Sequence, residues 1–516
     1  MRSIIDVSKA FTIVKSDLHG MTFVNYPFEE ELVDLDQQLW LDQITEKLQS
    51  DSYTPSVCDI AEVPKGKGAV RPGSILTLED QVVYTTLVDA IYGLLHKELL
   101  WSQGSTDYSY RLNTELGSKQ WFRDQFNGWK DFKDNSVKRI DEGDAFVVIT
   151  DITGFYENID HSLLLSDLRQ IHSPDEIVNA IRSCLVKWAQ LDTKGIPQGS
   201  SASHLLAKLY LNPVDSELKD LGYTHFRYVD DFRIFCSSIS EAKRALIDLT
   251  AILRKRGLNL QSAKSKIVRA DDAKPEIEGT ATLIDAVSKK IISQLEFVAD
   301  YPYSSSIRIN TEKPNQKQLV TIVNAFNDFF ANADDSSFDK SLFHYLLNKL
   351  GQAKDKSAFN YCLEQLERHP EETIDILRYI ERANMAKEAE DYLLKYINSD
   401  IAVYDYQNYK IIEWFLVNKL HHDQLINFAR AVAFDNNKPS YYRAICKKLL
   451  GLHGNTADLG RIKTSYNSAT TTVESCAILC SLKNMETARR NSFLSSVENT
   501  SDFHKRACKL VKQAVR

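Results

Sequence analysis

Asp230 and Asp231 stand side by side between two stretches rich in apolar and aromatic residues, 226–229 and 232–235. Such stretches are strong strand formers, whereas two adjacent carboxylates are disfavoured inside a strand. The pattern therefore predicts a hairpin with the two aspartates at its turn. Two negative charges held at one point repel each other unless a cation offsets them, and Mg²⁺ is the cation that carboxylate oxygens suit best.

A third carboxylate, Asp151, follows the apolar run 146–149, which predicts that it stands at the end of a buried strand. Carboxylates from separate strands that hold two metal ions about 4 Å apart can activate an attacking oxygen and stabilise a leaving oxygen in phosphoryl transfer. Asp151, Asp230 and Asp231 together supply that ligand set. The Asp-Asp pairs at 271–272 and 334–335 have polar or small neighbours, so we interpret them as ordinary solvated loops.

Between the carboxylate segments lies the sequence Gly-Ile-Pro-Gln-Gly-Ser-Ser-Ala-Ser, residues 195–203. Its glycines predict a flexible turn, and the apolar residues at helical spacing after Ser203 predict an amphipathic helix. A helix at this place could support a base pair from below.

The order of these segments resembles the palm of a reverse transcriptase. The segments that match the family's motifs A to D are, in chain order, the stretch that begins at Asp151, residues 195–203, the Tyr-Val-Asp-Asp sequence at 228–231 and residues 257–265. Residues 64–72 and 78–83 resemble the fingers of bacterial reverse transcriptases. The resemblance covers roughly residues 60–270 and implies a nucleotidyltransferase of the RNA-directed DNA polymerase family with a two-metal mechanism.

The resemblance also implies roles for individual residues. Asp151, Asp230 and Asp231, with the backbone carbonyl of Ile152, match the ligands of two Mg²⁺ ions, for which Mn²⁺ can substitute. Lys264 matches a lysine proposed to protonate the leaving pyrophosphate, although a lysine beside a triphosphate is also a plain counter-charge.

Five further positions match nucleotide contacts in the family. Lys65 and Arg71 match residues that contact the triphosphate, and Gln198 and Gly199 match residues near the nucleotide. Tyr156 matches the bulky residue that lies under the sugar and excludes a 2′-hydroxyl, and a plain core aromatic is the alternative reading of this position.

Composition and two departures from the family pattern bear on the nucleic-acid partner. The 516 residues carry a formal net charge of −7, which argues against a broad grip on duplex nucleic acid because such a grip needs many cations. Ser201 stands where many relatives have proline, and Thr153 replaces a common basic residue. Both changes weaken the expectation of a standard template grip.

Other features of the chain bear on its compartment. The eight cysteines show no paired Cys-x-x-Cys spacing and are interpreted as buried free thiols. The sequence contains no run of about twenty apolar residues, and its first residues lack the apolar core of a secretory signal. We therefore expect a cytoplasmic protein without a membrane partner.

After about residue 300 the strand-like runs disappear and helices come in pairs. Such pairs resemble an α-solenoid of the HEAT type, and an irregular helical bundle is the alternative. The predicted fold class is α+β, with reverse transcriptase fingers and palm over residues 1–300 and an all-α HEAT-like helical-repeat domain over residues 301–516. The expected helix pairs are 343–350 with 359–366, 374–380 with 386–397, and 411–420 with 425–434.

A reverse transcriptase core followed by a long helical region resembles the abortive-infection (Abi) reverse transcriptases, which are bacterial and prophage phage-defence polymerases. That resemblance implies template-independent DNA synthesis from dNTPs, primed by a tyrosine that keeps the single-stranded DNA product covalently attached. It also implies a homo-oligomer, a trimer or a hexamer. Candidate priming residues, chosen for mobility, are Tyr26, Tyr53, Tyr301 and Tyr303.

Two alternatives to this function stay open. One is a templated RNA-directed DNA polymerase of another bacterial group, which a requirement for added RNA would reveal. The other is a scaffold with a vestigial polymerase site, against which the intact carboxylate triad argues.

Overall fold

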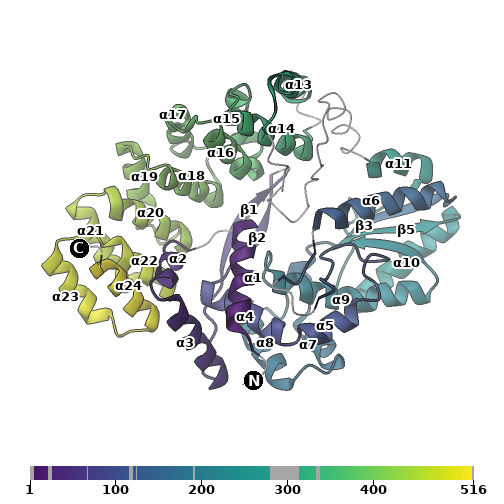
Figure 1. Cartoon of the computed structure of the whole chain (residues 1–516), viewed down its shortest axis with the longest axis horizontal. Helices are drawn as coiled ribbons and strands as arrows, with labels where there is room; N and C mark the ends of the chain where they lie inside the picture. The colour runs from purple at the N-terminus through teal and green to yellow at the C-terminus, as the bar shows by residue number, and fades with distance from the viewer. Residues whose placement is uncertain are drawn as a thin grey trace. The chain divides into compact units, whose positions relative to one another are not determined.

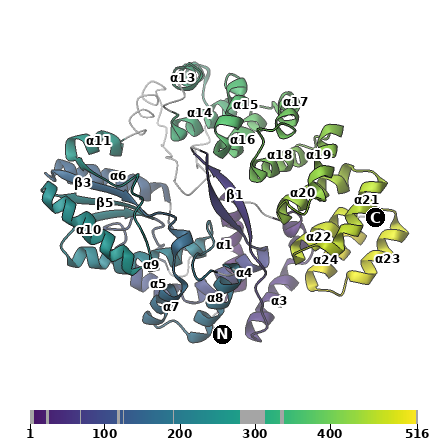
Figure 2. The same ribbon diagram turned by 180° about the vertical axis from the view of Figure 1, so that it is seen from behind.

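The computed structural model describes residues 5–20, 26–66, 68–115, 120–123, 125–189, 192–278, 313–332 and 338–513. These residues fold into two compact units (Figures 1 and 2). Within the described ranges, the first unit is drawn from 5–20, 45–55 and 81–278, and the second from 26–44, 56–80 and 313–513. The division therefore differs from a single boundary near residue 300, because two N-terminal segments pack with the C-terminal helices.

A four-stranded antiparallel sheet forms the centre of the first unit. Its strands are β3 (Phe146–Asp151), β4 (Thr224–Tyr228), β5 (Asp231–Cys236) and β6 (Lys266–Arg269), in the order β4-β5-β3-β6. Val147, Val148, Phe232 and Ile234 are fully buried, as their apolar type predicts for central strands. Residues 229–230 form the turn between β4 and β5, which confirms the predicted hairpin.

Helices surround this sheet. The helix α10 packs against β3 and β5, α6 against β4 and β5, and α9 against β4 and α10 (Figure 1). The predicted helix after residue 203 is α9, which begins two residues earlier because the Ser200 side chain caps it by accepting from the backbone N–H of Ser203. The helical elements of the unit are α1 (Val7–Gly20), α5 (Tyr92–Leu99), α6 (Gln125–Asp141), η1 (Tyr156–Asn158), α7 (His161–Gln170), α8 (Asp175–Trp188), α9 (Ser201–Asp220), α10 (Ile239–Lys255) and α11 (Ala270–Glu278).

Two helices cross from one unit to the other. The helix α3 (Gln37–Gln49) begins in the second unit and ends in the first, and so does α4 (Leu78–Ala90). The chain therefore passes between the units several times before residue 90.

The second unit consists of a β-hairpin and helices within its described residues. Alternate helices along the chain pack on one another, in the series α14, α16, α18, α20, α22 and α24. The six helices of the three predicted pairs are present, and of these pairs α16 contacts α17. Their assignment to the HEAT type stays a prediction. The helical elements are α2 (Glu29–Asp34), α13 (Gln316–Phe326), η2 (Asn327–Ala331), α14 (Lys340–Ala353), α15 (Phe359–Arg368), η4 (Pro370–Glu372), α16 (Thr373–Arg382), α17 (Ala386–Ile397), α18 (Asp405–Val417), α19 (Asp423–Ala433), α20 (Ser440–His453), α21 (Thr456–Thr464), η5 (Ser465–Ser468), α22 (Thr472–Ser481), α23 (Thr487–Val497) and α24 (Asp502–Gln513).

The hairpin formed by β1 (Asp59–Lys65) and β2 (Ala69–Ile75) belongs to this helical unit. Strand β1 contacts α18 and η4, and Ala61 in its middle is fully buried. The hydroxyl of Tyr26 lies 3.0 Å from Ser440 Oγ, and both hydroxyls hydrogen-bond Asp59. These buried contacts explain why the segment 56–80 joins the C-terminal helices.

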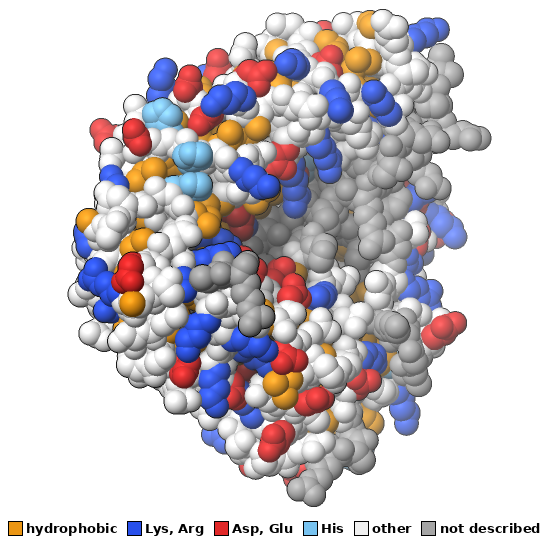
Figure 3. Space-filling model, turned by 60° about the vertical axis from the view of Figure 1, so that its left-hand side comes forward, with side chains coloured by type: hydrophobic (Ala, Val, Ile, Leu, Met, Phe, Trp, Pro, Cys, Tyr) orange, Lys and Arg blue, Asp and Glu red, His pale blue; other side chains and the backbone are white. Residues whose placement is uncertain are grey.

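Among the described residues, no helix combines the length and the apolar composition needed to cross a lipid bilayer. On the face shown in Figure 3, the described lysines and arginines are interspersed with aspartates and glutamates. All eight cysteines are buried free thiols, as the sequence predicts.

The helices α20 and α22 approach each other closely at Gly451. A Cβ atom at this position would lie 2.3 Å from the backbone oxygen of Ser481 and 2.8 Å from its Cα, so backbone would have to move. A buried ion-pair group joins the same two helices, because Glu474 accepts from Arg443 at 2.8 Å and from Lys447 at 2.9 Å.

We expect Gly451→Ala to lower the free energy of unfolding of the helical unit by about 1–3 kcal/mol, the usual effect of overpacking. The control is Gly93→Ala in α5, where a Cβ would meet nothing within 4 Å. That change should be neutral or stabilise the first unit, since alanine favours helix more than glycine. Thermal melts followed by circular dichroism compare the two variants, and equal melting temperatures would show that the helices are not closely packed at Gly451.

Candidate active site

The ends of two paired strands bring three carboxylates together. Asp151 is the last residue of β3 and pairs with Asp231, the first residue of β5. Asp230 precedes it in the turn, and its carbonyl accepts a hydrogen bond of 3.3 Å from the N–H of Ile152. The structure thus places these four predicted residues at one edge of the sheet, because antiparallel register aligns the end of one strand with the beginning of the next.

The turn that contains Asp230 is conformationally strained at the preceding residue. Val229 has a φ of +58°, a left-handed conformation that is rare for a β-branched residue. A residue in such a conformation costs about 1–3 kcal/mol and persists only where its surroundings hold it. One of those surroundings is the Arg227 guanidinium, whose Nη1 donates to the Val229 carbonyl at 2.9 Å.

Burial and mutual repulsion dominate the electrostatics of this edge. Asp151 and Asp230 are each only 7% exposed, and the Oδ1 atom of each is buried without a hydrogen-bond partner. Burial, together with the charges of Asp231 and Asp151, raises the pKa of Asp230 well above its ordinary value. Buried carboxylate oxygens that accept no hydrogen bond favour a proton or a cation beside them.

These observations fit a divalent metal site. Carboxylate oxygens are the preferred ligands of Mg²⁺, and both unpartnered oxygens belong to residues of the predicted ligand set. Asp151, Asp230 and Asp231, with the Ile152 carbonyl, would hold the ions.

Lys264 contacts this edge from a segment that is tied to the strand end. Its ammonium group donates to Asp151 Oδ2. The N–H of Gln261 donates to the Asp151 carbonyl at 2.7 Å. Burial alone would lower the pKa of Lys264, but the hydrogen bond with Asp151 and the charges of the three aspartates outweigh burial and raise it. Lys264 is therefore protonated at neutral pH and can act as a counter-charge or as a proton donor.

Tyr156, the first residue of η1, is 1% exposed. Burial raises its pKa well above the ordinary value, and the nearby Tyr110 and Asp230 raise it further. Its hydroxyl is hydrogen-bonded to His204 Nδ1 at 2.6 Å, and Tyr110 stacks on the same imidazole with ring centroids 3.9 Å apart. Burial lowers the pKa of His204 to about 3, so the imidazole is neutral.

The sequence did not single out His204 or assign chemistry to Tyr110. No local pattern pointed to either residue, because the two are 94 positions apart and meet only in the fold. Tyr156 is thus held by His204, on which Tyr110 stacks. This support fits both its proposed place under the sugar and the alternative of a core aromatic.

The segment that contains Gln198 and Gly199 is attached to the residues around Tyr156. The N–H of Ile196 donates to the Tyr156 carbonyl at 3.0 Å. Gly199 has a φ of +97°, which favours glycine at this turn. The side-chain oxygen of Gln198 is buried without a hydrogen-bond partner and is a free acceptor next to this turn.

Two hydrogen bonds to Asp17 explain why position 201 is a serine and not a proline. Its N–H and its hydroxyl donate to the two carboxylate oxygens of Asp17, at 2.8 and 2.6 Å. A proline would lack the N–H. Burial raises the pKa of Asp17 to about 6, although these two hydrogen bonds lower it. Helix α1 is thus connected to the beginning of α9 at a residue where the sequence departs from the pattern that it resembles.

Lys65 and Arg71 lie on the β1–β2 hairpin of the second unit, where Arg71 pairs with Val63 and Lys65 with Ala69. The structure thus groups them with the helices and groups the carboxylates with the sheet. Their contact with a triphosphate stays a prediction.

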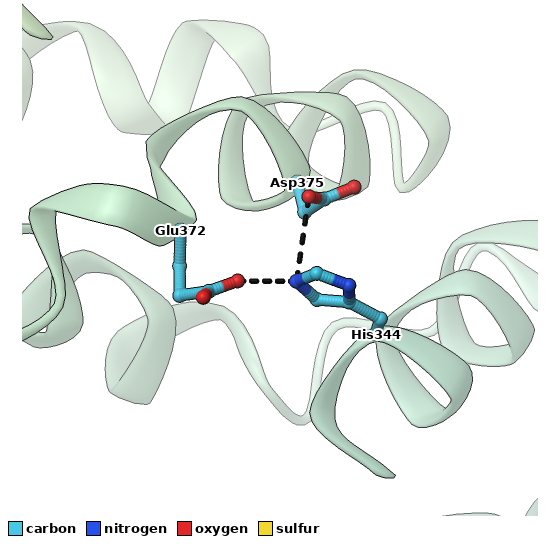
Figure 4. A group of neighbouring side chains, drawn as sticks. All are labelled: His344, Glu372 and Asp375. Carbon is cyan, nitrogen blue, oxygen red and sulfur yellow. Dashed lines mark hydrogen bonds and ion pairs between the residues drawn. The ribbon is translucent and has the colours of Figure 1, made fainter. Parts of the chain in front are cut away.

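One compact group of potential metal ligands occurs among the described residues, in the second unit: His344, Glu372 and Asp375, with ligand atoms within 4.8 Å of one another. Figure 4 shows the His344 imidazole facing both carboxylates, with Nε2 3.4 Å from Asp375 and hydrogen-bonded to Glu372. Lys340 and Arg378 lie 3.4 and 3.7 Å from the same carboxylates. Because cations already balance both carboxylates, we interpret the group as an ion-pair cluster that joins α14 to α16.

The comparison with known families agrees with the geometry of the first unit. Residues 63–316 match the family model of reverse transcriptases (RNA-dependent DNA polymerases). The chain therefore contains a reverse transcriptase domain.

Two curated proteins are distantly similar to this chain. Protein YkfC of Escherichia coli K12 is 22% identical over 282 residues, which cover 52% of this chain and 65% of that protein. A putative COX1/OXI3 intron 1 protein of Saccharomyces cerevisiae is 20% identical over 198 residues, which cover 37% of this chain and 22% of that protein. The chain thus spans less than two thirds of the length of either relative.

Solved telomerase structures are also similar to this chain. Telomerase from Candida albicans in complex with a TWJ fragment of telomeric RNA is 14% identical to this chain. The match covers 73% of this chain and 66% of the telomerase chain, with a TM-score of 0.32. Apo telomerase from Candida tropicalis is 11% identical to this chain. The match covers 92% of this chain and 74% of the telomerase chain, with a TM-score of 0.32. TM-scores this low support no conclusion about this chain.

We expect Asp230→Asn and Asp151→Asn to lower nucleotide incorporation by about 10²–10³-fold or more, because each removes a charge that serves the transition state. The control is Asp272→Asn, at an exposed aspartate in the first turn of α11, which should leave incorporation unchanged. Labelled dNTPs with Mg²⁺ measure the rates. Wild-type rates in both site variants would refute the assignment.

The substitution Asp230→Asn should not destabilise the fold. The pKa of folded Asp230 is raised above the unfolded value of about 3.9, so the folded state holds the proton more tightly. This carboxyl therefore makes the free energy of unfolding fall as pH rises above about 4. At pH 7 without metal, Asp230→Asn should melt at the wild-type temperature or higher, and a clearly lower melting temperature would contradict the repulsion.

Tyr156→Ala should raise ribonucleotide use relative to deoxyribonucleotide use by about tenfold or more, because it opens space for a 2′-hydroxyl. Tyr156→Phe is the control, since it keeps the ring and loses only the hydroxyl that contacts His204. The measurement is the ratio of the two incorporation efficiencies. An unchanged ratio in the alanine variant would mean that Tyr156 is a core residue only.

Proposed function

We propose that this chain is a DNA polymerase of the abortive-infection group of reverse transcriptases, which joins dNTPs without a template in defence against phages. The observation that carries the proposal is the carboxylate edge formed by Asp151, Asp230 and Asp231, with its two unpartnered buried oxygens. The presence of a reverse transcriptase domain and a long series of packed helices in one chain supports the assignment to the abortive-infection group.

Each residue of the site has a role in the proposed reaction. Ions held by the three aspartates would favour ionisation of the attacking hydroxyl and neutralise charge on the leaving pyrophosphate. Lys264, protonated beside Asp151, would return a proton to the pyrophosphate, and its hydrogen bond with Asp151 supports this role. Tyr156 would exclude a ribose hydroxyl.

Three nucleotide contacts complete the proposal. The free side-chain oxygen of Gln198, next to Gly199, would accept from the nucleotide. Lys65 and Arg71 on the β1–β2 hairpin would bind the triphosphate as cations.

Two features support synthesis without a template. The Ser201 N–H and hydroxyl both donate to Asp17, so neither is available to donate a hydrogen bond to a template strand. The net charge of −7 and the mixture of opposite charges on the face in Figure 3 offer little for a sequence-independent duplex grip. The product would be single-stranded DNA.

The helical unit supports a role in assembly. Stacked helix pairs present extended surfaces suited to protein partners. We propose that they contribute to a homo-oligomer, a trimer or a hexamer, located in the cytoplasm.

A second candidate is a templated RNA-directed DNA polymerase of another bacterial group. The matched family model, described as RNA-dependent DNA polymerase, favours it. A requirement for added RNA distinguishes the two candidates.

The proposed primer is a tyrosine, because a phenol with a pKa of about 10 ionises more easily than an aliphatic hydroxyl. Tyr26 was a candidate for its mobility, but it is 4% exposed and hydrogen-bonded, so it is no longer proposed as the primer. Burial and the Asp59 charge also raise its pKa well above the ordinary value. Tyr53 is half-buried. Tyr301 and Tyr303 lie outside the described residues.

We expect purified protein to incorporate a single labelled dNTP with Mg²⁺ and no added nucleic acid, and to retain the label on a denaturing gel. Nuclease should shorten the attached DNA, and mass spectrometry should place a nucleotide on one tyrosine. Asp230→Asn is the negative control. Incorporation only with added RNA would support the templated candidate, and label lost on boiling in detergent would rule out the covalent link.

A further inference from the structure

A buried group of charged side chains lies beneath the turn that carries the aspartates. Asp107, Lys208, Asp215 and Arg227 are each at most 3% exposed and all belong to the first unit. Lys208 contacts Asp107, and Arg227 contacts both carboxylates. Two cations thus face two anions, which makes the group electrically balanced in an environment where an unpaired charge would be costly.

Arg227 occupies the centre of this group. Its Nε lies 3.0 and 3.1 Å from the two oxygens of Asp215, and its Nη2 lies 2.9 Å from Asp107. Its remaining nitrogen, Nη1, donates to the backbone carbonyl of Val229 at 2.9 Å. Because the guanidinium is planar, the carboxylates that fix two of its nitrogens also fix the direction of the third.

The carbonyl that Arg227 holds belongs to the strained residue of the turn. Val229 has a φ of +58° and directly precedes Asp230. A valine released from this conformation would relax towards negative φ, and the peptide plane that leads to Asp230 would turn with it. The repulsion among the three aspartates favours such a release, since it would separate their charges.

The opposite side of the group is attached to the segment 106–110. The N–H of Arg227 donates to the Thr106 carbonyl at 2.7 Å, and its carbonyl accepts from Tyr108 at 2.9 Å. Lys208 donates to the Ser109 carbonyl at 2.8 Å. The next residue is Tyr110, whose ring supports His204 and, through it, Tyr156.

We propose that Arg227 is a positioning residue that holds the 229–230 turn so that Asp230 and Asp231 stay opposite Asp151 as one metal-binding set. Asp107 and Asp215 act through Arg227 by fixing its guanidinium. This inference rests on the proposed metal-dependent polymerase function. Charge balance alone does not require an arginine at position 227, since a lysine there would also balance the two carboxylates. The planar fork that reaches Val229 is what a lysine lacks.

The test is Arg227→Lys, which keeps the charge between Asp107 and Asp215 but cannot bind them and the Val229 carbonyl together. The control is Arg233→Lys, the same change on the same hairpin. Arg233 lies over the Phe132 ring at 4.0 Å and donates to Ser136 at 2.9 Å. Both partners belong to α6 and not to the turn, and a lysine keeps the positive charge that interacts with Asp231.

Three readouts are compared in the full-length protein. Mn²⁺ binding measured by electron paramagnetic resonance should weaken at least tenfold in Arg227→Lys. Amide hydrogen exchange at residues 228–231 should accelerate at least tenfold. The kcat for nucleotide incorporation should fall at least tenfold, while the KM for dNTP changes less than twofold. Arg233→Lys should stay within twofold of the wild type in all three.

A merely structural role predicts a different result: Arg227→Lys would lower the melting temperature, and the folded fraction would bind Mn²⁺ and exchange at the turn as the wild type does. That result overturns the proposal. If Arg227→Lys does not fold, Asp107→Asn replaces it. This change removes one charged acceptor of the guanidinium and should weaken Mn²⁺ binding by about threefold, and unchanged binding in folded Asp107→Asn overturns the proposal.

The design separates this inference from the proposed function. If the wild type incorporates no nucleotide, Mn²⁺ binding and hydrogen exchange still decide the role of Arg227. If the wild type binds no Mn²⁺ through its aspartates, the proposed function fails, and hydrogen exchange alone tests whether Arg227 holds the turn.

Discussion

Repulsion among three carboxylates is the constraint on which the first unit depends. The register of β3 against β5 places Asp151 opposite Asp231, and the turn adds Asp230 beside them. Partial burial strengthens the repulsion, because little water separates the charges. Such an arrangement persists only where neighbouring groups hold it in place or a cation offsets the charges. The surrounding structure must therefore hold the carboxylates without neutralising them completely.

Two kinds of contact meet this requirement. Lys264 supplies a positive charge from a half-exposed side chain, which an incoming ion can displace. Arg227, by contrast, is fully buried and binds Asp107, Asp215 and the backbone carbonyl of Val229 in the turn. One contact offsets charge, and the other fixes geometry. Separating the two tasks leaves the unpartnered oxygens of Asp151 and Asp230 free for a ligand.

The two units are interwoven along the chain. Segments 26–44 and 56–80 pack with the C-terminal helices, although each is followed by residues of the first unit. The hairpin with Lys65 and Arg71 consequently depends on the helical unit for its own packing. The helical unit is thus part of the fold that supports predicted nucleotide contacts, which explains why a boundary near residue 300 describes the chain incompletely.

Local pattern by itself determined the hairpin around Asp230, the strand that ends at Asp151 and the helices between residues 340 and 434, because alternation and helical spacing report which side chains are buried. Only the tertiary structure decided the partners. Arg227 meets Asp107 across 120 positions, and Tyr156 meets His204 across 48. Burial in a strand or helix is encoded locally, whereas the identity of a contact depends on how distant elements pack. Sequence spacing therefore indicated the reacting groups, and packing alone showed what holds them in place.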